Sequence, residues 1–153
     1  MNIGIGSDHR GVAIKTRITN LLKSHGHTVE DCGAYNSDSC DYPDIAHAVA
    51  ALIADGKAER GILVCGSGIG MSIAANKTTA VRAALCHDPH AAEMSRRHND
   101  ANVLCLSADH LDTLSTEAFD AIIETWMDTD FEGGRHQRRV EKITTGANSA
   151  CHE

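Results

Sequence analysis

Short apolar runs alternate along the chain with longer segments in which apolar residues recur at helical spacing. The clearest short run is Ile62-Leu63-Val64, which leads directly into a glycine-rich turn. Such runs predict buried strands, and the amphipathic segments between them predict helices. The expected strands are residues 2–6, 28–32, 60–65, 80–86 and 103–106. The expected helices are residues 12–25, 44–55, 70–76, 88–97, 114–127 and 135–143.

The alternation of strands and helices favours an α/β protein with a parallel sheet that helices cover on both faces, in three layers. The 153 residues suit one domain, which we expect to span residues 1–143. The polar residues 144–153 are expected to form a flexible tail. Ligands of such sheets bind beyond the carboxyl ends of the strands, so a site is expected in the loops there.

Composition narrows the function. The formal net charge of -7 argues against broad binding of nucleic acid or of an anionic membrane. The acidic Asp8 interrupts the first residues before they can form the apolar region of a signal peptide. No apolar run approaches the ~20 residues that span a bilayer. We therefore expect a cytoplasmic protein. Its six cysteines are expected to be free thiols, because nothing indicates secretion.

The turn at residues 65–70, with the sequence CGSGIG, is where we expect chemistry. Glycines let the backbone approach a ligand closely, and N–H groups at a helix start bind a phosphate or a developing oxyanion. The turn lacks the Gly-Lys-Ser/Thr ending of a P-loop. It also does not follow the first strand, as the dinucleotide fingerprint does. Tight strand-to-helix packing explains the same glycines, so both interpretations stay open.

The cysteine of this turn has two interpretations. Cys65 ends a buried strand at the mouth of the expected site, where a thiolate would serve as a nucleophile or as a base that removes a proton from carbon. The alternative is a packing cysteine. We expect that role for Cys32, Cys86 and Cys105, which lie in or beside apolar runs.

Polar residues near other predicted element ends are further candidates. Asp8 and His9 follow the first strand, although a helix-capping Asp and a surface His are equally expected there. His98 and Asn99 end a predicted helix, where ordinary polar residues are also common.

Two arginines of the last predicted helix form a possible phosphate clamp. Arg135 and Arg139 are four residues apart and so share one helix face. Guanidinium groups bind phosphate well, unless neighbours such as Glu132 or Glu141 neutralise them. A metal site is not expected, despite ten histidines, because the chain has no Cys-x-x-Cys and no His-Glu-x-x-His motif.

Five segments, taken together and in this order, resemble one family. They are IGIGSDH (3–9), DYP (41–43), CGSGIGMSIAANK (65–77), SRRHNDANVL (95–104) and FEGGRHQRRV (131–140). The chain resembles the ribose-5-phosphate isomerase B family, which also holds galactose-6-phosphate and allose-6-phosphate isomerases. The resemblance implies a Rossmann-like doubly wound sheet and a homodimer or homotetramer with active sites at a subunit interface. It also implies that no metal or other cofactor is used.

The implied activity is an aldose–ketose isomerisation between ribose 5-phosphate and ribulose 5-phosphate through an enediolate. By resemblance, Cys65 would be the base that moves a proton between C2 and C1. Ser67 would assist at the substrate oxygens. The turn's N–H groups, at Gly66, Gly68 and Gly70, would hold the enediolate oxyanion.

The remaining substrate contacts are also implied only by resemblance. They fall on Asp8, His9, Tyr42, His98, Asn99, Arg135 and Arg139. Asp8 and His98 would help to open the furanose ring. Tyr42 and Asn99 would line the sugar pocket, and the other three would hold the phosphate.

One position departs from the family pattern. Many members carry an Arg shortly after the fifth strand that reaches the neighbouring subunit's phosphate, whereas this chain has Asp109 and then His110. A carboxylate repels phosphate, so another aldose, such as allose 6-phosphate, or a non-phosphorylated sugar is an alternative substrate. A non-catalytic phosphate- or nucleotide-binding module is the alternative from another class.

Overall fold

The apolar runs form the sheet that they predict. The computed structural model describes residues 1–145, in which the strands are all parallel and ordered β2-β1-β3-β5-β4. The strands are β1 (Asn2–Ser7), β2 (Thr28–Asp31), β3 (Arg60–Cys65), β4 (Ala83–Leu85) and β5 (Val103–Ser107). Every residue of β3 and β5 is buried. The predicted α/β class and the Rossmann-like doubly wound sheet are confirmed.

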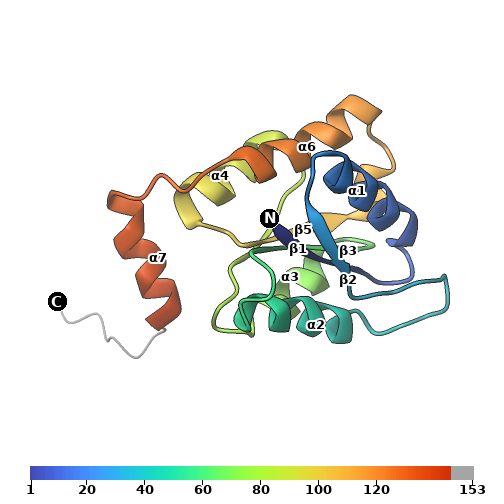
Figure 1. The fold of residues 1–153 in the computed structure, drawn as a ribbon, viewed down its shortest axis with the longest axis horizontal. Helices are drawn as coiled ribbons and strands as arrows, with labels where there is room; N and C mark the ends of the chain where they lie inside the picture. The colour runs from blue at the N-terminus through green and yellow to red at the C-terminus, as the bar shows by residue number, and fades with distance from the viewer. Residues whose placement is uncertain (146–153) are drawn as a thin grey trace.

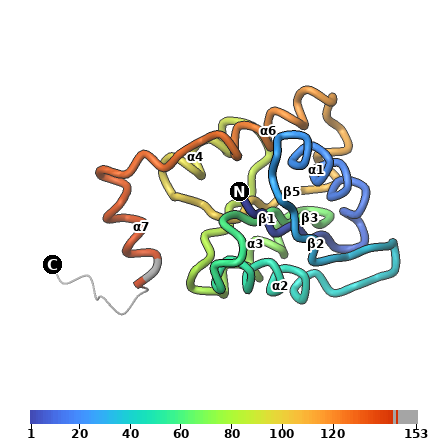
Figure 2. The backbone as a smooth tube through the Cα atoms, viewed as in Figure 1, coloured from blue at the N-terminus to red at the C-terminus, as the bar shows by residue number. Residues whose placement is uncertain are grey.

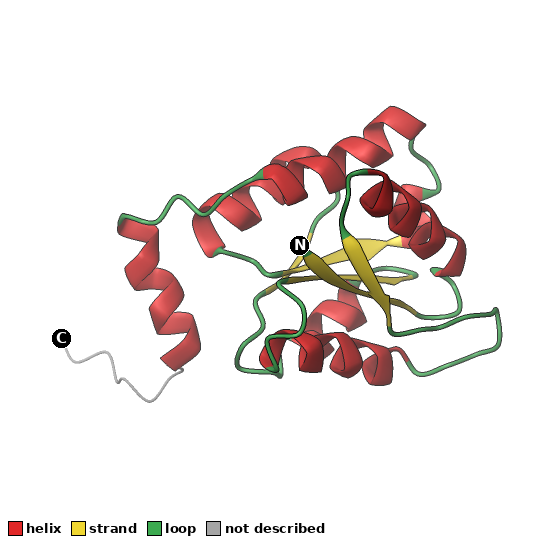
Figure 3. Cartoon of the chain, in the orientation of Figure 1, coloured by secondary structure: helices red, strands yellow, loops and turns green. Residues whose placement is uncertain are grey.

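Helices cover both faces of this sheet (Figures 1 and 3). They are α1 (Val12–Ser24), α2 (Tyr42–Ala54), α3 (Ile69–Ala75), α4 (Pro89–Asn99), α5 (Ala108–Leu111), α6 (Thr116–Asp128) and α7 (Arg135–Thr145). One face is covered by α1, α4 and α6, and the other by α2 and α3. The last helix, α7, projects away from the sheet (Figure 2) and contacts α4. Among residues 1–145, none of the helices is both long and apolar enough to span a membrane.

The alternation of side chains along β3 divides the core into two parts. Ile62 and Val64 pack on the face of α1 and α6, whereas Leu63 and Cys65 pack on the face of α2 and α3. The Cys65 side chain, at the end of β3, therefore lies on the face of the sheet that α3 covers.

The helix boundaries differ from prediction where local capping decides them. The second helix, α2, begins two residues before the expected Asp44, because Pro43 fits its first turn; Asp41 at the N-cap position makes no side-chain hydrogen bond to the helix. The short α5 was not predicted; its start is capped by Ser107, whose Oγ accepts the N–H of His110 at 3.1 Å. The last helix extends two residues past the expected domain end, and the rest of the predicted tail lies outside the described residues.

Candidate active site

The glycine-rich turn joins β3 to α3 and fixes the thiol beneath it. Gly68 has a φ of 75° and donates its N–H to the Cys65 sulfur at 3.2 Å. Ile69 donates its N–H to the Ser67 hydroxyl at 3.3 Å. Cys65 itself is only 5% exposed. The thiol is thus held in one orientation by a backbone donor, with a serine hydroxyl in the same turn.

Each glycine of the turn is closely approached by a neighbour, so the packing interpretation also applies. A Cβ on Gly68 would lie 2.9 Å from the backbone of Leu106, and one on Gly70 would lie 2.6 Å from the Tyr42 ring. On Gly66 it would collide with the Arg10 guanidinium. A side chain at Gly68 or Gly70 would overlap these atoms, whereas at Gly66 the exposed Arg10 side chain can move aside.

Asp8 and His9 lie at the same edge of the sheet as this turn. The Asp8 N–H donates to the carbonyl of Val64, which places the loop after β1 beside the end of β3. The buried Asp8 carboxylate accepts N–H groups from Arg10 at 2.9 Å and Gly11 at 3.2 Å. It therefore shapes the turn before α1 but does not cap the helix, because the N-cap is Gly11 and no side chain bonds there. His9 Nδ1 accepts the Cys40 N–H at 3.5 Å, in the loop that leads to Tyr42.

An ion pair that the sequence did not indicate lies over the turn. Arg10 Nη2 donates to Asp109 Oδ1 at 2.5 Å. The Asp109 N–H in turn donates to the carbonyl of Gly66 at 3.1 Å, and the Ser107 hydroxyl donates to the same carbonyl at 2.8 Å. Asp109 is thus not an isolated negative charge but the partner of a guanidinium. The available signal was that both residues directly follow strands of one parallel sheet.

The other expected site residues lie at the opposite edge of the sheet. His98 and Asn99 end α4, and the chain then enters the amino end of β5 at Val103. Arg135 begins α7, which follows the end of α6 on this same side and contacts α4. A strand of six residues, such as β3, spans roughly 17–20 Å. One chain therefore does not bring His98, Asn99, Arg135 and Arg139 together with Cys65.

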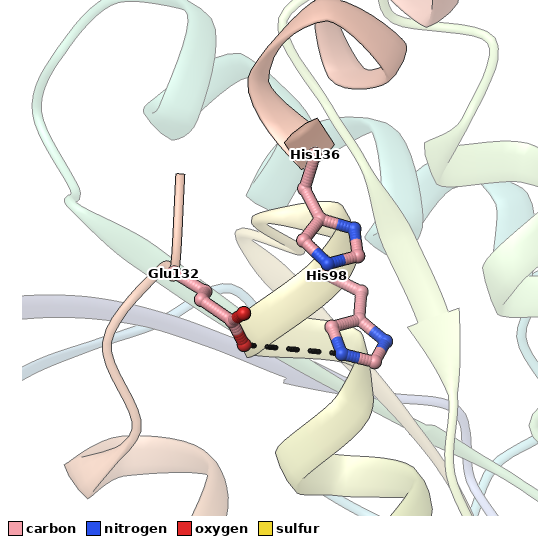
Figure 4. Close-up of side chains that lie close together, drawn as sticks. All are labelled: His98, Glu132 and His136. Atoms are coloured by element: carbon pink, nitrogen blue, oxygen red, sulfur yellow. Dashed lines mark ion pairs between the residues drawn. The ribbon is translucent and has the colours of Figure 1, made fainter. Parts of the chain in front are cut away.

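His98 belongs to a cluster with two residues that the sequence analysis did not assign (Figure 4). Its ring stacks on that of His136, with centroids 4.2 Å apart and planes 9° apart. The Glu132 carboxylate lies 4.0 Å from His98 Nε2 and also accepts from Arg97 at 3.0 Å. Glu132 therefore holds an anionic oxygen beside the imidazole of His98. Both added residues lie in the FEGGRHQRRV segment, which was the available signal.

Titration of this cluster follows from its packing. Removal from water, reinforced by the nearby His98 and Arg135, lowers the pKa of His136, which is 4% exposed. The hydrogen bond from Arg97 lowers the pKa of the Glu132 carboxyl. His136 is thus neutral, and Glu132 charged, at neutral pH.

The same cluster is the place to consider a metal ion. One potential ligand atom from each of His98, Glu132 and His136 lies within 4.8 Å of the others. However, Arg135 Nε donates to His136 Nε2 at 3.3 Å, and Arg97 occupies a Glu132 oxygen. Two guanidinium donors therefore compete for the lone pairs that a cation would need.

The arginines of α7 keep the exposure that a clamp requires. Arg135 and Arg139 are both exposed. Of the acids considered as their neutralising partners, Glu132 pairs with Arg97 and Glu141 accepts from Gln137.

Three cysteines away from the turn, the half-buried Cys32 and the buried Cys86 and Cys105, have a different environment. Burial raises the pKa of Cys32 and Cys86, and raises that of Cys105 far above its usual range. These thiols therefore stay protonated, as expected for packing residues. Within the described residues the five cysteines are free.

The chain matches one family of known proteins over most of its length. The family model described as Ribose/Galactose Isomerase matches residues 3–143. Ribose-5-phosphate isomerase B of Escherichia coli (strain K12) is 43% identical over 142 residues, which cover 93% of each chain. D-erythrulose-4-phosphate isomerase of Pectobacterium atrosepticum is 43% identical over 147 residues, covering 94% of this chain and 93% of the relative.

Solved structures give the same result. The ribose-5-phosphate isomerase B of Clostridium thermocellum has a TM-score of 0.90 at 45% identity, covering 95% of this chain and 96% of that chain. The type B enzyme of Trypanosoma cruzi has a TM-score of 0.88 at 45% identity, covering 95% and 97%. The fold and the matched segments define a sugar-phosphate isomerase. The chain belongs to the Ribose/Galactose Isomerase family, as its sequence segments predict.

Proposed function

We propose that this enzyme interconverts ribose 5-phosphate and ribulose 5-phosphate by proton transfer through an enediolate, without a metal or other cofactor. The observation that carries the proposal is the Cys65 sulfur, held at 3.2 Å by the Gly68 N–H beneath the turn. The relatives that match most of this chain include enzymes named ribose-5-phosphate isomerase B. Proton transfer beside a carbonyl needs a positioned base and a group that stabilises the oxyanion, and this turn supplies both.

The proton transfer begins on the open-chain aldose. The Cys65 thiolate removes the C2 proton, the electron pair forms the C1–C2 double bond, and the C1 carbonyl oxygen becomes the enediolate oxyanion. The Gly68 and Ile69 N–H groups are engaged by Cys65 and Ser67. The remaining backbone N–H groups of the turn and the Ser67 hydroxyl hold the oxygens. A proton passes from the C2 hydroxyl to the C1 oxygen, which moves the oxyanion to the C2 oxygen. The C1–C2 electron pair then takes the proton back from sulfur at C1, and the C2 oxyanion becomes the carbonyl of the ketose.

The site is composed from two copies of the chain. Cys65, Ser67, Asp8, His9 and Tyr42 occupy the carboxyl edge of the sheet, which we name the thiol half-site. His98, Asn99, Arg135 and Arg139 occupy the amino edge and α7, which we name the arginine half-site. In a homodimer the arginine half-site of one copy faces the thiol half-site of the other.

Exposed apolar residues near each half-site support such an assembly. Ile69 and Ile73 on α3 are 53% and 57% exposed beside the turn. Ile143 is 56% exposed on α7, the helix that projects from the sheet. Burial of these side chains between copies would stabilise a dimer by the hydrophobic effect.

Each half-site contributes separate groups to binding and ring opening. His98, with Glu132 beside it, exchanges a proton with the ring oxygen, and Asp8 orients the hydroxyl at the anomeric carbon. Arg135 and Arg139, two charges on one helix face, hold the phosphate together with His9. Tyr42 and Asn99 line the sugar.

Allose 6-phosphate is the alternative substrate. It is supported by position 109, where the resemblance implies an Arg that reaches the substrate phosphate and this chain has Asp109, paired with Arg10. One relative at 43% identity is named as an isomerase of a four-carbon sugar phosphate.

The test is a turnover panel of four-, five- and six-carbon sugar phosphates and their unphosphorylated counterparts, run with and without EDTA. We expect the highest kcat/KM with ribose 5-phosphate and no effect of EDTA. A preference for another sugar phosphate would change the proposed substrate and leave the proposed proton transfer unchanged. Tight binding of these compounds without turnover of any would show a binding module instead.

A further inference from the structure

The ion pair of Arg10 and Asp109 has no role in the chemistry above, yet it lies on the turn that carries the thiol. The Arg10 guanidinium occupies the space over Gly66, the residue after Cys65. The backbone of Asp109 is fixed to the same residue, because its N–H donates to the Gly66 carbonyl at 3.1 Å. The two charged groups therefore meet directly above the turn.

The fold does not need this pair. The side chains of Arg10 and Asp109 are 54% and 57% exposed. Exposed pairs of this kind contribute little to stability, because solvent screens them and ordering both side chains costs entropy. A guanidinium has five N–H donors in a fixed fork, and the recorded bond to Asp109 engages only Nη2. Donors of Arg10 are therefore available to a second acceptor.

We propose that Arg10 binds the phosphate group of the substrate and that Asp109 sets the strength of this contact by competing for the same guanidinium. The proposal rests on the proposed function, since it assigns Arg10 to the anionic end of a sugar phosphate bound at the thiol half-site. Arg10 follows His9 directly in the loop after β1, so both side chains leave the same short loop. The acceptor class is a phosphate monoester, which a guanidinium fork matches in geometry and charge.

The competition gives opposite predictions for the two partners. Arg10→Ala removes donors from the phosphate and should raise the KM for the sugar phosphate about ten- to hundredfold, with a smaller change in kcat. Arg10→Lys should recover part of this loss, because it keeps a charge and loses the fork. Asp109→Asn releases the guanidinium and should lower the KM several-fold. In the double variant Asp109→Asn should have no such benefit, because the group that it frees is gone.

The control is a second Arg–Asp ion pair, half-buried and far from the turn. Arg17 donates to Asp120 at 2.9 Å and joins α1 to α6. Arg17→Ala and Asp120→Asn make the same changes of charge, and should leave KM and kcat as in the wild type.

The experiment measures KM and kcat with the sugar phosphate and, by calorimetry, the Kd of inorganic phosphate for every variant. A lower phosphate affinity in Arg10→Ala and a higher one in Asp109→Asn support the proposal, whether or not the wild type turns over a sugar. If the wild type is an active isomerase but Arg10→Ala changes neither KM nor phosphate Kd, the assignment of Arg10 is wrong and the proposed function stands. If no sugar phosphate is turned over, the proposed function fails, and the phosphate Kd values alone decide the assignment. A change confined to kcat would also overturn it.

Discussion

The Gly68 N–H points at the Cys65 sulfur across 3.2 Å, and it does so because Gly68 takes a left-handed backbone conformation. The donor of this contact and the base of the proposed reaction are three residues apart in sequence. The contact itself is local, whereas the end of β5 holds the turn in place through the bonds of Ser107 and Asp109 to the Gly66 carbonyl.

Replacement of the thiol tests its role directly. Cys65→Ala removes the proposed base and should lower kcat by about 10²- to 10⁴-fold, the range that general-base catalysis supplies. The KM should change little, because the thiol does not hold the phosphate. Cys32→Ser is the control, since burial raises the pKa of that thiol and keeps it protonated. Steady-state kinetics with equal folded fractions decides the matter, and full turnover by Cys65→Ala would remove Cys65 from the mechanism.

The conformation of the turn predicts a stability difference between two glycines. Gly68→Ala combines a φ of 75° with a Cβ 2.9 Å from the Leu106 backbone. Gly26→Ala has a similar φ of 80°, but no described atom lies within 4 Å of its Cβ. Positive φ costs an alanine about 1–2 kcal/mol at either site, and the steric overlap at Gly68 adds about 1–3 kcal/mol. Urea unfolding should therefore show the larger loss for Gly68→Ala; equal losses would mean that the turn yields without cost.

The buried imidazole of His136 predicts a dependence of stability on pH. Its pKa is lowered in the folded chain, so below the ordinary value near 6.5 the unfolded chain takes up the proton first. The contribution of neutral His136 to the free energy of unfolding is complete above pH 6.5. It is lost as the pH falls from there toward the lowered pKa. His27 has a lowered pKa as well and acts in the same direction.

The measurement is the free energy of unfolding at several pH values between 8 and 5, in denaturant. His136→Gln should flatten the decline below pH 6.5, and the decline that persists belongs to His27 and other groups. An unchanged slope in His136→Gln would show that this imidazole titrates alike in both states.

The separation of the half-sites predicts complementation between two defective chains. Cys65→Ala damages the thiol half-site and Arg139→Ala the arginine half-site. After random subunit exchange about half of the dimers are mixed. Each mixed dimer has one site with both defects and one intact site, so about one quarter of wild-type activity should return. If both residues served one site within a chain, no activity would return. Exchange is verified with two different affinity tags, so that a negative result counts against the composite site.

The sequence predicted the fold from its apolar runs because β3 and β5 are buried on both faces and read as continuous hydrophobic segments. It missed α5 because four residues capped by Ser107 leave no periodic pattern. From the sequence, Asp109 was interpreted as an unpaired negative charge. Its partner Arg10 is 99 residues away, and only the order of strands β1, β3 and β5 brings the two side chains together. His136 was missed for a similar reason: its burial depends on the stack with His98, and neither residue reveals this in sequence.

The position of Cys65 and His98 at opposite edges of one sheet has a kinetic consequence. Under the proposed function, a lone chain has both sets of groups and cannot use them together. Turnover per chain would then fall on dilution below the dissociation constant of the dimer, although every chain stays folded. Enzyme concentration would act as a control on specific activity, and a plot of rate against chain concentration would curve upward at its lower end.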